Sequence, residues 1–481
     1  MNDLASRAYG RFHEPHAARR AALACMVTLA VALGIGRFAF TPLLPLMLHG
    51  GAAGQPLLDI QHGGWLASAN YAGYFVGAVT CAALRVSPGR MVRLGLAATV
   101  LLTLAMGLAG PFWFWALVRF VAGAVSAWTF VFASQWGLRR LAELGAHAWS
   151  GVIYTGPGVG IVGTGLLVSV AGGYGATAGW IGFGLIGAVL SVLVWPVFAD
   201  GARAGGARRA GAGAAPAAQP STATRATVKA PGSDPGDEAG SPMGNERDGQ
   251  PAGQSANQQG IHRGSEFAHR PGNHARPVRT LSASTAHRAD AFWLILLYGI
   301  PGFGYIITAT FLPVIARHAL PGSAWPDLFW PMFGAALIVG ALLGARLPAH
   351  WDNRVLLAGC YVLQAIGIAL GIVWPTAGGF SLGSILIGLP FTAITLFAMR
   401  EARRLRGDDA AGLMGYATAA YGIGQIAGPL VAAPIAAHTG SFSPALWLAA
   451  GALIAGAVGL IAVTQVSRGR KRSRMPDCGC N

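Results

Sequence analysis

The chain has 481 residues, of which 53% are hydrophobic and only 11% are charged. Soluble domains carry about 25% charged residues, so this composition excludes an ordinary soluble globular protein and indicates one that crosses a membrane repeatedly. The formal net charge of +16 does not indicate nucleic-acid binding, because the arginines cluster at the ends of apolar runs and in one long polar stretch.

Apolar runs of about 20 residues, the length that crosses a bilayer, give about twelve predicted membrane spans. Their approximate limits are 21–47, 62–84, 91–109, 111–136, 148–171, 175–198, 290–316, 325–347, 354–374, 378–400, 411–437 and 443–466. Arginines mark alternate connections between these spans, such as Arg90 after the second and Arg403 after the tenth, and both ends of the chain. Because such residues stay on the cytoplasmic side, both termini are predicted to be cytoplasmic, as in a multi-pass protein of a bacterial inner (plasma) membrane.

The spans predict an all-α polytopic membrane protein in two halves. Its predicted parts are a cytoplasmic N-terminal segment (1–20), a first six-helix half (21–199), a linker (200–289), a second six-helix half (290–466) and a basic cytoplasmic tail (467–481). The linker is rich in Gly, Ala, Pro, Ser and Arg and has no apolar run long enough to fold. It is therefore predicted to be disordered in the cytoplasm, as a plain tether or as a regulatory segment.

The most informative stretch is Gly34-Ile-Gly-Arg-Phe-Ala-Phe-Thr-Pro-Leu-Leu-Pro45, in the middle of the first span. A helix that only filled lipid would contain neither Arg37 nor the prolines, because charge inside the bilayer is costly and proline interrupts helical hydrogen bonds. Glycine lets a neighbouring helix approach closely. We interpret this span as a wall of a pathway, with hinges here and in the corresponding spans. The predicted hinge residues are Gly34, Gly36, Pro42, Pro45, Gly156, Pro157, Gly160, Gly302, Gly304 and Pro313.

The second half repeats this pattern. Without a gap, three residues of the first span align with three of the seventh, namely Gly34, Gly36 and Pro45 with Gly302, Gly304 and Pro313. A second set aligns in the same order at nearly the same offset, namely Gly151, Gly158 and Gly160 with Gly415, Gly422 and Gly424. Tyr305 takes the position of Arg37. The shared order predicts that the two halves are parallel repeats.

On these features the chain resembles the major facilitator superfamily, and the first-span signature resembles its YbfB/YjiJ-type family. The resemblance implies two six-helix halves and transport, without implying a substrate. The loop after the second span keeps Leu84, Gly89 and Arg90 of a superfamily motif but has Val86 in place of its acidic residue. Two further patterns resemble superfamily motifs associated with proton coupling and with exporters, namely Arg119 with Gly123, and Gly156-Pro157-Gly-Val-Gly160.

Two charges lie clearly inside predicted spans, Arg37 and Arg119. At the rise of an α-helix both lie roughly 10–16 Å below the outer surface, so they can face one cavity. No Asp or Glu lies clearly inside a span, which favours an anionic substrate such as a carboxylate, held by the guanidinium fork. Alternatively, each arginine binds backbone carbonyls freed at the prolines or at a glycine kink. Tyr305 either donates a hydrogen bond to the substrate or packs.

Coupling to an ion gradient needs a titratable group, and the predicted ones are Asp59, His62 and Glu401. Each is alternatively a polar residue of the membrane interface, Glu401 pairing with the adjacent Arg400. Aromatic or polar side chains that can contact a substrate or simply pack are Asn70, Tyr71, Tyr74, Tyr154, Tyr416 and Tyr421. Tryptophans near span ends are interpreted as interface anchors, namely Trp113, Trp115, Trp325 and Trp330.

These features predict a secondary transporter that moves a small, anionic organic solute by alternating access, coupled to protons. One alternative is a broad-specificity drug or metabolite exporter in which the arginines are structural. Another is a receptor or scaffold that signals through the linker. An enzyme is not expected, since the chain lacks the His-Glu-x-x-His, Gly-x-Ser-x-Gly and Gly-x-x-x-x-Gly-Lys motifs. We expect no cofactor, and no metal site at the terminal pair Cys478 and Cys480. The expected partners are the substrate, protons and the lipid bilayer.

Overall fold

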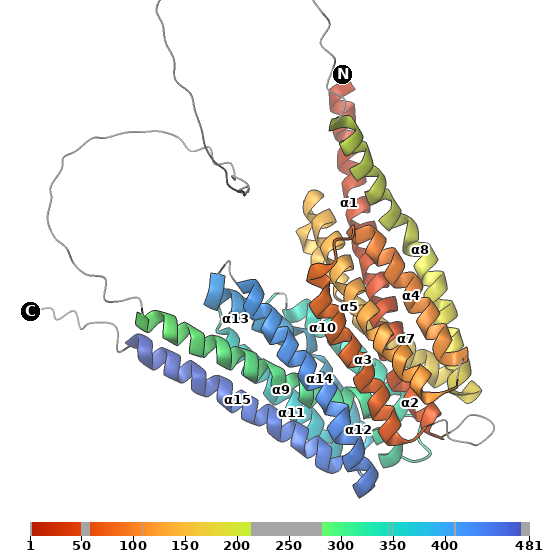
Figure 1. Ribbon diagram of the computed structural model, residues 1–481, viewed down its shortest axis with the longest axis vertical. Coiled ribbons are helices and arrows are strands. Elements are labelled where there is room, and N and C mark those ends of the chain that lie inside the picture. Colours follow the sequence, from red (N-terminus) through yellow and green to blue (C-terminus); the bar gives the residue numbers. More distant parts are fainter. Residues whose placement is uncertain are drawn as a thin grey trace, which may run out of the picture.

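The computed structural model describes residues 2–49, 58–108, 110–212, 281–344, 346–348, 350–407 and 410–472 (Figure 1). These residues form helices and short connections, and they contain no strand. Most of the predicted linker, 213–280, and the end of the predicted tail, with Cys478 and Cys480, lie outside them. The helix before the linker continues to Ala212 and the helix after it begins at Leu281, so both extend into the predicted linker range.

The helices follow one another in the expected order. The first half contains α1 (Asn2–Leu29), a π-helical segment (Ala30–Phe38), α2 (Phe40–His49), α3 (Ile60–Thr80), α4 (Pro88–Leu108), α5 (Phe112–Glu143), α6 (Ser150–Ile153), α7 (Gly156–Ala171) and α8 (Gly175–Ala212). The second half contains α9 (Leu281–Ala319), α10 (Pro326–Gly344), α11 (Asn353–Val373), α12 (Ala377–Gly388), α13 (Phe391–Arg406), α14 (Ala410–Thr439) and α15 (Ser443–Arg472).

Among the described residues, 10 helical stretches are long and apolar enough to cross a membrane. One of them, 147–199, contains both α7 and α8, and the more polar α3 adds a further span, so the fold has about twelve spans as predicted. The largest boundary errors are at α1, which begins at Asn2 instead of 21, and at α8, which continues past the predicted end at 198 to Ala212. Similarly, α5 continues past the predicted end at 136 to Glu143. In α5 the extra turns remain helical because Leu141, 1% exposed, packs into the apolar core of the first half.

The predicted repeat is visible as a matched pair of helix crossings. A Cβ on Gly34 would lie 2.4 Å from the Cα of Gly160, so the first and fifth spans are in backbone contact there. In the second half, a Cβ on Gly424 would lie 3.1 Å from the carbonyl carbon of Gly302, the residue equivalent to Gly34. Only glycine permits these approaches, which explains why the same glycines recur in both halves.

The two halves pack against each other through α3 with α14, α7 with α10, and α2 with α9. They diverge towards the end that carries the N-terminus, the end of α8 and the start of α9, here called the linker end (Figure 1). The opposite end, here called the far end, is where α2 stops and α3 begins. The contacts between the halves therefore hold the middle and the far end of the molecule together.

Candidate functional site

The site is built on the π-helical segment of the first span. Pro42 has no N–H, so it cannot donate to the carbonyl five residues earlier, that of Arg37. Arg119, on α5 and 2% exposed, supplies donors in its place. Its Nη2 donates to the carbonyl oxygen of Arg37 at 3.1 Å and its Nη1 to that of Gly36 at 3.2 Å. These contacts correspond to the backbone-binding alternative for Arg119.

Arg37 lies at the junction of the two halves and is 5% exposed. Its guanidinium carbon lies 4.0 Å from the centre of the Tyr74 ring and 5.1 Å from that of Tyr71, both on α3. It lies 5.2 Å from the ring of Phe38. Aromatic faces attract a cation but supply no negative charge. Among the described residues, no carboxylate forms an ion pair with Arg37 or Arg119.

The hydrogen-bond partner of Arg37 is a neutral amide from the other half. Arg37 Nη2 donates to Oε1 of Gln425, on α14, at 3.0 Å. The amide nitrogen of Gln425 donates in turn to the hydroxyl of Tyr305, on α9. The Nε of Arg37 is buried and has no hydrogen-bond partner in the described part of the chain. The structure thus brings the repeat-related residues Arg37 and Tyr305 together, with Gln425 between them.

Stacked rings of the second half adjoin this amide. Tyr421 lies 6.0 Å from Tyr305 and 5.0 Å from Tyr298, ring centre to ring centre, with interplanar angles of 21° and 22°. Phe391 meets Tyr305 edge-on at 5.0 Å. The sequence predicts possible substrate contacts at Tyr71, Tyr74 and Tyr421. It does not predict Gln425, Tyr298 or Phe391. A polar residue in the middle of the eleventh span was the one signal for Gln425.

The other predicted contacts lie elsewhere. Asn70 donates to the carbonyl oxygen of Arg119 at 2.8 Å, so it joins α3 to α5. Tyr154 packs near Phe130 in the first half, and Tyr416 is 69% exposed.

The anchor interpretation is wrong for two of the four tryptophans. Trp330 is fully buried, stacks on Phe333 at 5.1 Å and faces Phe38 across the interface between the halves. Trp115 is 5% exposed and donates to the carbonyl oxygen of Met106 at 3.1 Å. Both lie near the end of a predicted span, but on the side that packs inside the protein.

Asp59 and His62 lie at the far end, and their side chains are exposed. Asp59 caps the start of α3, and its carboxylate is 2.8 Å from Nδ1 of His62. Slight burial would raise the pKa of Asp59, but the hydrogen bonds and charge of His62 outweigh it and the pKa is lowered. This pair lies at the first turn of α3, away from Tyr71 and Tyr74.

Glu401 is 1% exposed and lies in an ion network at the linker end of the second half. Its carboxylate accepts from Arg354 at 2.6 Å and from Arg404 at 2.5 Å. Arg354 also pairs with Asp290 at 3.0 Å. The expected pair with Arg400 is wrong, because that side chain turns to the carbonyl oxygen of Leu347 at 3.3 Å. The network joins α9, α11 and α13.

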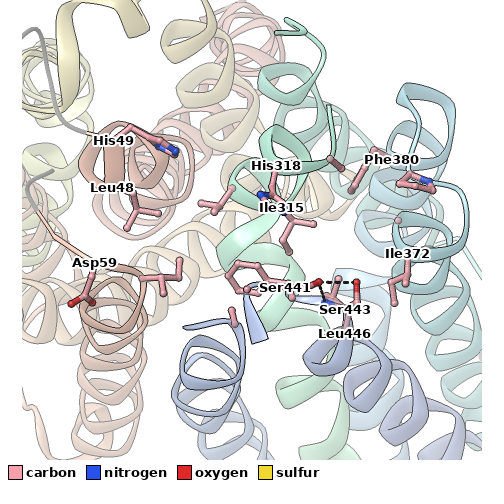
Figure 2. Close-up of a pocket in the computed structure, with 18 of the residues that line it drawn as sticks. Leu48, His49, Asp59, Ile315, His318, Ile372, Phe380, Ser441, Ser443 and Leu446 are labelled. Atoms are coloured by element: carbon pink, nitrogen blue, oxygen red, sulfur yellow. Dashed lines mark hydrogen bonds between the residues drawn. The ribbon is translucent and has the colours of Figure 1, made fainter. Parts of the chain in front are cut away.

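A separate cavity of about 760 Å³ opens at the far end between the two halves. His49 from α2 and His318 from α9 face it, and most of its remaining lining is apolar (Figure 2). Val314 lines the cavity one helical turn, about 6 Å, beyond Thr310 on α9. Thr310 contacts the hydroxyl of Tyr71 at 2.9 Å, and the Tyr71 ring contacts Arg37, so the side chains of Thr310 and Tyr71 lie between Val314 and Arg37.

Two bundles of membrane-spanning helices that meet around a buried, charged site define a multi-pass membrane transporter of the major facilitator type. The chain matches the family described as "Uncharacterised MFS-type transporter YbfB" over residues 29–230 and 267–461, and it belongs to that family.

A chloramphenicol resistance protein of Streptomyces lividans is 33% identical over 162 residues, which are 30% of this chain and 37% of that protein. The chain therefore aligns with little more than a third of that relative.

Two crystal structures of the nucleoside transporter NupG each cover 93% of this chain and 99% of their own. One, a mutant, has a TM-score of 0.61 and 12% identity, and the other a TM-score of 0.56 and 11% identity. At these identities the likeness shows the fold.

Proposed function

We propose that this transporter moves a small organic anion with a carboxylate group by alternating access. The observation that carries the proposal is the state of Arg37. It is buried, and among the described residues it hydrogen-bonds to a neutral amide, pairs with no carboxylate and has no partner at Nε. Nε and Nη2 form the side of a guanidinium that binds a carboxylate through two parallel hydrogen bonds. A carboxylate in place of the Gln425 oxygen would satisfy both donors and balance the charge.

The alternative, that Arg37 is purely structural, leaves its charge unexplained. Removing an arginine from water without an opposite charge costs several kcal/mol, and intramembrane arginines generally serve function. Arg119 has a local reason to be present, since it satisfies two carbonyls of the bent first span. We therefore propose that Arg37 binds the charged group of the substrate and that Arg119 positions the first span.

The route to the site follows from how the halves meet. Besides the bond from Arg37 to Gln425, the described residues form three hydrogen bonds between the halves from this level towards the far end: Thr41 to Ala309, Ser68 to Ile426, and Tyr71 with Thr310. Towards the linker end the halves diverge (Figure 1). The arginine pattern assigns the linker end to the cytoplasm. We propose that the halves open towards the cytoplasm and that these hydrogen bonds close the site to the outside.

We further propose that the proton gradient supplies the energy. Of the predicted coupling groups, Asp59 with His62 is the pair in contact with solution on the outer side, whereas Glu401 is held between two arginines. We expect an Asp59→Asn variant in proteoliposomes to take up the anion down the anion's own concentration gradient. When a pH difference across the membrane is imposed, this variant should no longer accumulate the anion against that gradient. Unchanged pH-driven accumulation by this variant would remove Asp59 from the mechanism.

The test of the anion assignment uses purified protein in proteoliposomes and a panel of labelled organic anions. Arg37→Ala should lose uptake of the transported anion while keeping its yield and its elution as a single species. Arg140→Ala is the matched control, since Arg140 is an exposed arginine paired with Glu143 on α5. Normal uptake by Arg37→Ala would refute the assignment.

A broad-specificity exporter remains the second candidate, supported by the chloramphenicol resistance relative and by the Gly156-Pro157-Gly-Val-Gly160 pattern. In that case expression of the chain should raise resistance to several neutral compounds, and Arg37→Ala should leave the resistance intact. Loss of resistance in that variant would argue for the anion transporter instead.

A further inference from the structure

The site has two chemically different sides, and each side comes from one half. The first half contributes the guanidinium of Arg37. The second half contributes a stack of three tyrosine rings, formed by Tyr298, Tyr421 and Tyr305. Gln425 lies one helical turn after Tyr421 on α14 and spans the two sides, with its oxygen on Arg37 and its nitrogen on the Tyr305 hydroxyl. A planar group with an acceptor atom thus already occupies the junction.

The tyrosine stack is more than apolar filling. Its ring centres are 5.0 and 6.0 Å apart, within the range in which aromatic rings attract one another beyond simple burial. Tyr298 precedes Tyr305 by seven residues on α9, which begins at the linker end, so the stack runs from the site towards that end. Tyr305 is fully buried, whereas Tyr421 in the middle of the stack is partly exposed. The hydroxyl of Tyr298 is hydrogen-bonded to Thr395 at 3.1 Å and that of Tyr305 to Gln425. The partly exposed ring of Tyr421 is the part of the stack that a ligand can reach.

From this juxtaposition we propose that the substrate is an aromatic carboxylate whose charge binds Arg37 and whose ring packs on the tyrosines of the other half. The inference rests on the proposed function and adds a substrate class to it. The carboxylate takes both Nη2 and Nε of Arg37 and displaces the amide oxygen of Gln425. Gln425 thus holds the place on Arg37 that the carboxylate takes. Such a substrate touches both halves at once, which links binding to their relative movement.

Other solutes use only one side of the site. An aliphatic carboxylate would pair with Arg37 but gain only apolar contact from the tyrosines. A neutral aromatic compound would pack on the rings but leave Arg37 bonded to Gln425. Affinity should therefore require both the charge and the ring.

Four compounds of nearly equal size separate the two requirements: benzoate, benzamide, cyclohexanecarboxylate and cyclohexanecarboxamide. Their dissociation constants are measured by calorimetry on the purified full-length chain in detergent. Benzoate should bind most tightly, about 10- to 100-fold more tightly than benzamide, because its hydrogen bonds to Arg37 are charge-assisted. It should bind about 2- to 10-fold more tightly than cyclohexanecarboxylate, because of the aromatic contacts.

Two variants assign these effects to their residues. Tyr421→Leu should remove the preference for benzoate over cyclohexanecarboxylate and leave the binding of cyclohexanecarboxylate within about 2-fold. The matched control is Tyr416→Leu, which changes an exposed tyrosine on the same helix and should leave both constants unchanged. The melting temperature of each variant without ligand shows whether it is folded.

The outcomes distinguish a failure of this inference from a failure of the proposed anion transport. If both carboxylates bind equally well and both amides bind poorly, the aromatic class is wrong and the anion transporter stands. If benzamide equals benzoate, the anion assignment fails and takes the inference with it. If none of the four binds, or Tyr421→Leu keeps the full preference for benzoate, the inference is overturned.

Discussion

Arg37 and Tyr305 occupy equivalent positions in the two halves of the chain and hold opposite ends of one amide, that of Gln425. A symmetric fold thereby acquires an asymmetric site, with a charge on one side and a phenol on the other. The amide joins the halves by hydrogen bonds that a carboxylate ligand can replace. This relationship leads to the first prediction.

Gln425→Glu should lock the site. The new carboxylate would lie beside the guanidinium of Arg37 and form a charge-assisted bond, which a substrate anion would have to displace. We expect anion affinity to fall by more than about 10-fold while the melting temperature rises. Calorimetry and thermal unfolding measure the two effects. Gln425→Leu is the comparison, since it removes the amide without adding charge and should retain anion binding. Normal transport by Gln425→Glu would contradict this account.

Arg119→Ala should act on stability more than on affinity. The substitution leaves the carbonyl oxygens of Gly36 and Arg37 without their donors, at about 1–3 kcal/mol for each buried group. The melting temperature should fall markedly, and Arg119→Lys should restore only part of it because an ammonium does not form the same fork. If Arg119→Lys melts normally yet binds no anion, Arg119 contacts the substrate and our assignment is wrong.

Glu401→Gln should destabilise the second half. The variant leaves Arg354, 4% exposed, with less opposing charge, and breaking a buried ion pair costs about 3–5 kcal/mol. Glu143→Gln is the control, because its pair with Arg140 is exposed and such pairs contribute at most about 1 kcal/mol. Thermal unfolding compares them. Should Glu401→Gln unfold normally but lose only pH-driven uptake, Glu401 is a coupling residue after all.

Gly160→Ala should separate the first and fifth spans. A Cβ there would lie 2.6 Å from the Cα of Gly34, so one helix must move, and overpacking of this kind costs about 1–3 kcal/mol. Gly163→Ala on the same helix has nothing within 4 Å of the new Cβ and should be neutral or stabilising by up to about 1 kcal/mol. Equal melting temperatures for the two variants would show that the crossing tolerates a side chain.

The sequence predicts the fold, and it singles out Arg37 and Tyr305 of the candidate site. Long apolar runs and the recurrence of Gly34 and Gly160 as Gly302 and Gly424 carry the two-half architecture, because they depend on local composition. Arg37 stood out because a charge is rare inside a span. The pairing of Arg37 with Gln425 could not be derived in the same way, since it depends on which faces of two distant helices meet.

The errors have the same origin. Trp330 lies near the end of a predicted span, which suggests an anchor, but its side of α10 faces the first half and is covered by Phe38. Glu401 pairs with Arg404 at helical spacing, which periodicity can suggest, whereas Arg354 reaches it from another helix. Contacts between helices decide both cases, and hydropathy does not encode them.

The far-end cavity makes the barrier to the outside thin. Between its floor at Val314 and the layer of Thr310 with Tyr71 lies one turn of α9, about 6 Å of protein. Three hydrogen bonds join the halves across this barrier: Thr41 to Ala309, Ser68 to Ile426, and Tyr71 with Thr310. Together they stabilise its closed form by about 3 kcal/mol. One charge-assisted bond gained by a bound anion is of similar size, so a single solute can offset the hydrogen-bonded part of this barrier.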